Sequence, residues 1–78
     1  MIQVVIRCAG HSLFEGVEDG DVVELEEGST VADLLTRLGV EPRFLEYVVP
    51  FVNEDPKELS YVFFDGDELR PFVPVSGG

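Results

Sequence analysis

The feature that most constrains the fold is a single short helix between Thr30 and Gly39. Thr30 offers a side-chain oxygen as an N-cap, Asp33 follows three residues later as in a capping box, and Gly39 is suited to end the helix. Apolar residues recur at helical spacing along one stripe, at Val31, Leu34, Leu35 and Leu38. Because a lone helix of this length is marginal in water, its stripe must be buried against a sheet built from the rest of the chain.

Two segments before the helix alternate between apolar and polar residues, which is typical of strands with one buried face. The first segment alternates between residues expected in the core, which are Ile2, Val4, Ile6 and Cys8, and residues expected to face away, which are Gln3, Val5 and Arg7. In the second, residues 21–26, Val23 and Leu25 are expected to point inward. Turn residues lie between the two segments, so they can pair as an antiparallel hairpin.

The sequence after the helix predicts further β-strands. Residues 43–46 are compatible with a helical turn, whereas residues 47–52 are apolar and typical of a strand. Pro50 has no N–H to donate to a ladder, so we expect this strand near a sheet edge or with a bulge. Asp65-Gly66-Asp67 is a strong turn signal, and a last strand is expected from Glu68 toward Val75.

The order strand, strand, helix, strand, strand predicts an α+β fold. The β-grasp, a ubiquitin-like mixed sheet of four to five strands with one helix across one face, is the compact way to arrange these elements. A chain of 78 residues has no room for a second core, so residues 1–78 are expected to form one domain with a flexible tail from about residue 74. Phe63 and Phe64 are expected to close the small core.

The excess of acidic over basic residues limits the classes of molecule that can bind this chain. The chain has 16 acidic and five basic residues, which gives a formal net charge of −11. Such a field repels phosphate backbones and anionic lipid headgroups, so we expect neither nucleic acid nor a membrane as a partner. A basic protein surface is a suitable partner. The alternative, that the acids only keep a small domain in solution, is equally compatible with the composition.

The remaining composition predicts a cytoplasmic protein without a cofactor or metal. No apolar run approaches the roughly 18 residues of a membrane span, and the N-terminus is typical of a strand and not of a signal peptide. Cys8 has no second cysteine and is expected to pack as a small hydrophobe, while His11 has no ligating neighbour. Asp65 and Asp67 are expected to shape a turn. No set of nucleophile, base and oxyanion donor can be assembled, so we expect no enzyme activity.

Three stretches of the sequence form a family pattern together. They are Gly28–Leu35 at the start of the helix, Val52-Asn53-Glu54 after the third strand, and Asp65–Leu69 leading to Pro74-Val75-Ser76-Gly77-Gly78. In these stretches the chain resembles the β-grasp sulfur carriers typified by MoaD of molybdopterin synthase and ThiS of thiamine biosynthesis. The resemblance is closer to MoaD, because proline and valine precede the final glycines. The stretch Cys8–Glu15 departs from the family by lacking an arginine, which leaves the acceptor enzyme open.

The resemblance implies a specific chemistry at the chain end. Gly78 would be adenylated on its carboxylate by an activating enzyme like MoeB or ThiF, and sulfur from a persulfide donor would then give a thiocarboxylate. Two glycines, Gly77 and Gly78, would let the tail enter a narrow channel because they carry no β-carbon. The acceptor would be an enzyme such as the molybdopterin synthase large subunit. Taken alone, the two glycines are more typical of a frayed terminus than of a reactive one.

Other functions remain open at this point. Within the same chemistry, the chain is compatible with thiazole formation for thiamine or with another sulfur transfer. In a different class, it is compatible with a ubiquitin-like modifier that is joined through Gly78 to lysines of other proteins. Lys57, the one lysine of this chain, would be its only site for chain building. A non-covalent binding module with an idle tail is the third possibility.

A docking surface is expected on the face of the sheet that the helix leaves uncovered. If Leu69 and Pro71 face the helix, then Arg70 and Phe72 face away from it. The candidate partner-binding residues are this outward pair, two residues of the first strand and the tail, namely Phe72, Arg70, Val5, Arg7, Val73, Pro74, Val75 and Ser76. An exposed phenylalanine beside the tail is a suitable docking anchor, although scattered surface residues without a role would give the same pattern.

Overall fold

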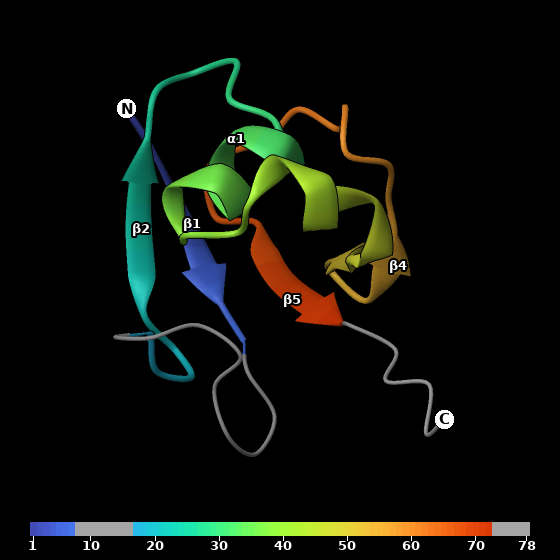
Figure 1. The fold of residues 1–78 in the computed structure, drawn as a ribbon. Helices are drawn as coiled ribbons and strands as arrows, with labels where there is room; N and C mark the ends of the chain where they lie inside the picture. The colour runs from blue at the N-terminus through green and yellow to red at the C-terminus, as the bar shows by residue number, and fades with distance from the viewer. Residues whose placement is uncertain (8–16, 73–78) are drawn as a thin grey trace.

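The protein is a mixed five-stranded sheet with its helices on one face (Figure 1). The structure is a computed structural model that describes residues 1–7 and 17–72. The strands are β1 (Ile2–Ile6), β2 (Val22–Leu25), β3 (Val49–Val52), β4 (Asp55–Pro56) and β5 (Glu68–Phe72), and the helical segments are α1 (Val31–Arg37) and the 3-10 helix η1 (Pro42–Tyr47). This arrangement confirms the predicted α+β architecture, and η1 confirms the helical turn expected after residue 42.

The first strand and the last described strand lie side by side in the sheet, whose order is β2-β1-β5-β3-β4. β1 pairs antiparallel with β2, as the sequence predicted, and parallel with β5. Backbone hydrogen bonds from Val5 N to Asp67 O (2.9 Å) and from Arg7 N to Leu69 O (2.8 Å) join the parallel pair. A parallel pair needs a long crossover connection, so the segment between these strands, including α1, must pass over one face of the sheet.

The core lies between the sheet and α1, where the inward side chains of β1 pack with the apolar stripe of α1. Its buried members are Ile2, Val4, Ile6, Leu25, Val31, Leu34, Leu35, Val48, Val52, Phe63 and Leu69. The inward side chains predicted for β1 and α1 are among them, except that Leu38 is only partly buried and that Cys8, like His11, lies outside the described residues.

The expectation that Phe64 closes the core is wrong, because its side chain is 69% exposed. Phe63 N donates to Ser29 O (3.0 Å), which joins this segment to the start of the helix and places the Phe63 side chain in the core. In extended backbone the next side chain points the opposite way, so Phe64 faces solvent. Only one of the two adjacent phenylalanines therefore contributes to the core.

The predicted helix punctuation is confirmed at both ends of α1. Thr30 Oγ1 accepts a hydrogen bond from Asp33 N (3.2 Å), and the Asp33 carboxylate accepts one from Thr30 N (2.9 Å). Gly39 adopts a φ of 101°, a left-handed conformation that favours glycine and ends the helix. Within the described residues, no helix is long and apolar enough to cross a membrane.

Pro50 is accommodated because β3 lies next to the edge of the sheet and only the two-residue β4 lies outside it. Pro50 is opposite Pro71 of β5. Asn53 N donates to Glu68 O (2.9 Å), and antiparallel pairs alternate between bonded and non-bonded positions. Counting back from this bonded pair places both prolines at a non-bonded position. Their missing N–H groups therefore cost the β3–β5 ladder no hydrogen bond.

A buried carboxylate joins three segments at one end of the sheet. Asp67 is only 7% exposed and accepts hydrogen bonds from Asn53 Nδ2, Tyr61 Oη and Phe64 N, each at 2.9 Å. Partial burial raises the pKa of Tyr61 above its ordinary value of 10.0, and the hydrogen bond to Asp67 and the charge of Asp67 raise this pKa further. Asp67 therefore shapes the expected turn and also ties it to the loop after β3.

We expect Asp67→Ala to lower the free energy of unfolding by on the order of 3 kcal/mol, because three donors lose a charged acceptor. Chemical denaturation followed by circular dichroism measures this change. Asp55→Ala is the matched control, since Asp55 is exposed on β4 and its loss should change stability by less than about 0.5 kcal/mol. Equal effects of the two substitutions would contradict the role assigned to Asp67.

Candidate functional site

The candidate site is the face of the sheet opposite α1, which we call the open face. The burial pattern of β5 places Leu69 and Pro71 in the interior and leaves Arg70 and Phe72 exposed, with Phe72 53% exposed. The predicted orientation of β5 is therefore confirmed. Val5 of β1 and the adjoining Arg7 are partly exposed on this same face. The predicted role of these side chains in docking stays a prediction.

The tail carries the other predicted site residues. Val73, Pro74, Val75, Ser76, Gly77 and Gly78 lie outside the described residues. The last described residue is Phe72, at the end of β5. Six residues follow Phe72 in the sequence, and a segment of that length spans at most about 22 Å when fully extended.

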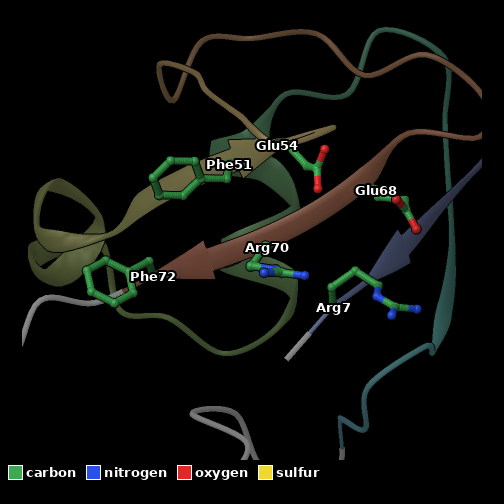
Figure 2. Close-up of a pocket in the computed structure, with 6 residues that line it drawn as sticks. All are labelled: Arg7, Phe51, Glu54, Glu68, Arg70 and Phe72. Atoms are coloured by element: carbon green, nitrogen blue, oxygen red, sulfur yellow. The ribbon is translucent and has the colours of Figure 1, made fainter. Parts of the chain in front are cut away.

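The parallel pairing of β1 and β5 brings Arg7 beside Arg70. Val5 is paired with Glu68 and Ile6 with Leu69, so one further step along the two strands places the arginines next to each other. Both side chains are on the open face, and Figure 2 shows them extending from neighbouring segments. The sequence predicted both residues for this face, but it could not show that they are neighbours.

A shallow depression of about 460 Å³ occupies the open face. Its lining residues are Arg7, Phe51, Glu54, Glu68, Arg70 and Phe72 (Figure 2). Sequence reasoning missed Phe51, Glu54 and Glu68. The alternation of β5 was sufficient to find Glu68, because it lies two residues before Arg70. Phe51 could be assigned to this face only once β3 was known to pair with β5, which places Phe51 opposite Arg70.

The open face carries two arginines, and within the described residues only Arg7 has a carboxylate within ion-pair distance. Arg7 Nε lies 3.5 Å from Asp19 Oδ1, and both side chains are about half exposed. Within residues 1–7 and 17–72, no carboxylate lies within 4.0 Å of the Arg70 guanidinium. By contrast, Arg43 pairs with Glu41 at 2.8 Å. Arg70 is thus available to a ligand or partner, whereas Arg7 already contacts Asp19.

Glu54 lines the depression on the open face and has a backbone conformation that is unfavourable for a residue other than glycine. Asn53 and Glu54, the two residues between β3 and β4, have φ values of 51° and 73°. Positive φ at both central residues is the geometry of a type I′ hairpin turn, in which glycine is preferred at the second position. Asn53 is fixed by its bonds to Asp67 (2.9 Å) and to Glu68 N (3.1 Å). The buried carboxylate network therefore also holds the residue before Glu54 in this turn.

The chemistry of this face suits docking. Among the described residues there is no group of three or more His, Cys, Asp or Glu side chains that could hold a metal ion. Two phenyl rings, Phe51 and Phe72, lie at one end of the depression, and the charged side chains lie at the other (Figure 2). Such a surface offers apolar contact area together with charges that can orient a protein partner.

We expect Glu54→Gly to raise the free energy of unfolding by about 0.5 to 1 kcal/mol, because glycine adopts positive φ without a steric penalty. Glu68→Gly is the matched control: it removes the same side chain from an ordinary strand position and should lower stability by a similar amount. Thermal melts of both variants measure the two changes. A loss of stability in both variants would show that Glu54 is not strained.

Comparison with known proteins identifies a family and a fold. The family model described as "ThiS family" matches residues 12–78. SAMP1 from Haloferax volcanii is similar in structure, with a TM-score of 0.68, 22% identity, and coverage of 97% of this chain and 99% of that chain. A chain in the protein–protein complex of subunits 1 and 2 of the molybdopterin-converting factor from Helicobacter pylori has a TM-score of 0.61, 20% identity, and coverage of 99% and 100%. No curated protein sequence matches significantly. These structural likenesses confirm the predicted β-grasp fold.

Proposed function

This chain belongs to the ThiS family of small ubiquitin-like sulfur carriers, and on that premise we propose that it carries sulfur as a thiocarboxylate on Gly78. The observation that most supports the proposal is the family match, which extends over residues 12–78 and so includes the tail. Members of this family are small carrier subunits and not catalysts themselves. The reactions of the tail therefore take place in the active sites of partner enzymes.

The proposed reactions begin at the Gly78 carboxylate. In an activating enzyme like MoeB or ThiF, a carboxylate oxygen attacks the α-phosphorus of ATP, and pyrophosphate leaves. The terminal sulfur of a persulfide then attacks the acyl carbon, and AMP leaves. A thiol cleaves the resulting sulfur–sulfur bond, which gives a disulfide and the thiocarboxylate. Because the first step consumes ATP, we place these reactions in the cytoplasm.

We further propose that the acceptor is the large subunit of a molybdopterin synthase. Two observations support this choice over other sulfur acceptors. Pro74 and Val75 precede the final glycines as in MoaD, and the fold is similar to that of a chain in the two-subunit molybdopterin-converting factor. In that protein the two subunits form a complex, which is the kind of assembly proposed for this chain and its acceptor.

The alternative functions share the first step of the tail chemistry, which is adenylation of the Gly78 carboxylate. A carrier for thiamine thiazole or for another sulfur transfer would use the same adenylate and thiocarboxylate. A ubiquitin-like modifier would use the adenylate but would end as an amide on a lysine of another protein. The likeness to SAMP1 is compatible with this second alternative. The fate of the Gly78 carboxylate therefore distinguishes the carrier from the modifier.

Intact-mass analysis of the protein isolated from its native host tests this distinction. We expect the free chain together with a form in which one oxygen is exchanged for sulfur, because a carrier releases its sulfur and regains its carboxylate. Peptide mapping of the host proteome should find few lysines that bear the tail. Abundant lysine adducts without any thiocarboxylate form, in cells supplied with ample sulfur, would favour the modifier.

A second test concerns the docking role of the open face. We expect Phe72→Glu to weaken binding to the activating enzyme of the same organism by about 10- to 100-fold, because burial of a phenylalanine contributes about 1.5 to 3 kcal/mol. Its melting temperature should change little, since Phe72 is exposed. Phe64→Glu is the matched control, because Phe64 is also exposed but does not line the depression. Titration calorimetry measures both affinities, and equal losses would refute docking through Phe72.

A further inference from the structure

We propose that strand β2 is a pairing edge for a second copy of this chain, and that Arg37 of α1 keeps this edge closed in the monomer. β2 forms one outer edge of the sheet, and among the described residues no strand pairs with its outer side (Figure 1). Such an edge presents backbone groups that can pair with another chain. Pairing through β2 does not depend on the proposed function, because it involves no residue of the tail.

The direction of the backbone groups of β2 follows from the register of the sheet. Val5 N donates to the carbonyl of the residue before β5 (2.9 Å), so the backbone groups of Val5 point toward β5 and those of Val4 point toward β2. Val4 is opposite Val23, which makes these two residues a hydrogen-bonded pair. Because bonded and non-bonded pairs alternate, the N–H and C=O groups of Val22 and Glu24 point away from β1, at the outer edge.

The side chain of Arg37 occupies one of these outward groups. Arg37 lies in the last turn of α1, and its Nη1 donates to Glu24 O over 2.6 Å. A charged donor makes this a strong hydrogen bond. In the part of the chain that the structure describes, no carboxylate lies within 4.0 Å of the Arg37 guanidinium, although the chain has 16 acidic residues. The guanidinium is therefore directed to the strand edge and not to an ion pair.

The outer edge of β2 is complementary to itself. When two copies are placed antiparallel about a two-fold axis at Val23, Val22 of each copy is opposite Glu24 of the other. Both residues have outward backbone groups, so each such pair can exchange both of its N–H···O=C bonds. The carbonyl that Arg37 occupies is the acceptor for the Val22 N–H in each pair. Pairing therefore requires Arg37 to release this carbonyl in both copies.

The side chains near this axis also suit a second copy. Val23 is partly buried against the core, and the two-fold axis places the Val23 residues of the two copies opposite each other with their side chains on the core side of the sheet. Val22 is 54% exposed and would contact the aliphatic part of the partner copy's Glu24. Apolar contact would thus accompany the backbone bonds. The product would be one continuous sheet with both open faces on the same side.

Charge repulsion opposes the same pairing. Each copy has a formal net charge of −11. In the two-fold register the Glu24 residues of the two copies are diagonal neighbours on one face, at about 7 to 8 Å. Salt screens both the long-range repulsion and this local one. The edge is therefore closed by the Arg37 hydrogen bond and by a repulsion that salt weakens.

The opposite edge of the sheet is blunted in another way. β4 has only two residues, and one of them, Pro56, has no N–H to donate. A very short edge strand with a proline offers little to pair with. β2 has the sequence VVEL without a proline, so its length and composition leave it open to pairing. It is thus the edge of this sheet at which a side chain is needed for closure.

Removal of the Arg37 side chain tests this closure. We expect Arg37→Ala to self-associate at least about 10-fold more tightly than the wild-type chain, because no charge-assisted hydrogen bond has to be broken in either copy. Sedimentation velocity of concentrated samples in about 1 M salt, where the screening length is about 3 Å, compares the two chains. Arg43→Ala is the matched control, since it changes the net charge equally but removes a side chain that pairs with Glu41. Equal self-association of the two variants would overturn the proposal.

Amide hydrogen exchange locates the pairing surface in the Arg37→Ala chain. The N–H groups of Val22 and Glu24 should exchange more slowly at high chain concentration than at low, because the dimer bonds both of them. The Val23 N–H is the internal control, since it bonds to β1 in the monomer and in the dimer. Slowed exchange at other residues, with Val22 and Glu24 unchanged, would place the contact elsewhere and overturn the proposal.

A proline at the edge provides an independent test. Addition of Val22→Pro to Arg37→Ala removes an outward N–H that pairing needs, but it removes no hydrogen bond of the β1–β2 ladder. We expect the double variant to return to the self-association of the wild-type chain and to keep the circular dichroism spectrum of the folded protein. A folded double variant that associates as tightly as Arg37→Ala would refute pairing through β2. The exchange measurement on the single variant decides the question whether or not the double variant folds.

Discussion

The parallel pairing of β1 with β5 is the constraint on which the rest of the structure depends. Two strands from opposite ends of a short chain can pair in parallel only if the chain between them crosses over the sheet. Here that crossover includes α1, whose apolar stripe covers one face and leaves the other without a helix among the described residues. The same pairing places Arg7 beside Arg70. The core and the open face are therefore two consequences of a single pairing.

The buried carboxylate of Asp67 connects this sheet to the details of the open face. Asp67 accepts a hydrogen bond from Asn53, and Asn53 accepts one from the amide of Glu68 at the start of β5. Asn53 is also the first residue of the left-handed turn that contains Glu54. A charged group with only 7% exposure is costly unless its acceptor sites are used, and here three donors satisfy it. The network that stabilises the turn before β5 thus also positions one end of the candidate docking surface.

Local sequence patterns were sufficient to predict those helices and strands whose buried face is marked by the residues of the element itself. The capping box at Thr30 and the alternation of β1 and β5 each specify a buried side without reference to any partner. Features that depend on contacts between distant segments were missed. The Asp67 network joins residues up to 14 positions apart, and Phe51 reaches the open face only through pairing with β5. Phe64 was assigned wrongly because composition suggested a core residue where the backbone direction turns its side chain outward.

The mixture of charged and aromatic side chains on the open face also limits nonspecific association of the free protein. A wholly apolar face on a domain of this size would be a contiguous patch prone to nonspecific association. Arg7, Arg70 and Glu68 lie beside the rings of Phe51 and Phe72, so charged groups that bind water interrupt the apolar part of this face. A partner that binds this face would have to supply charges complementary to these side chains. The side chains that keep the free face from being wholly apolar are therefore the ones that would select such a partner.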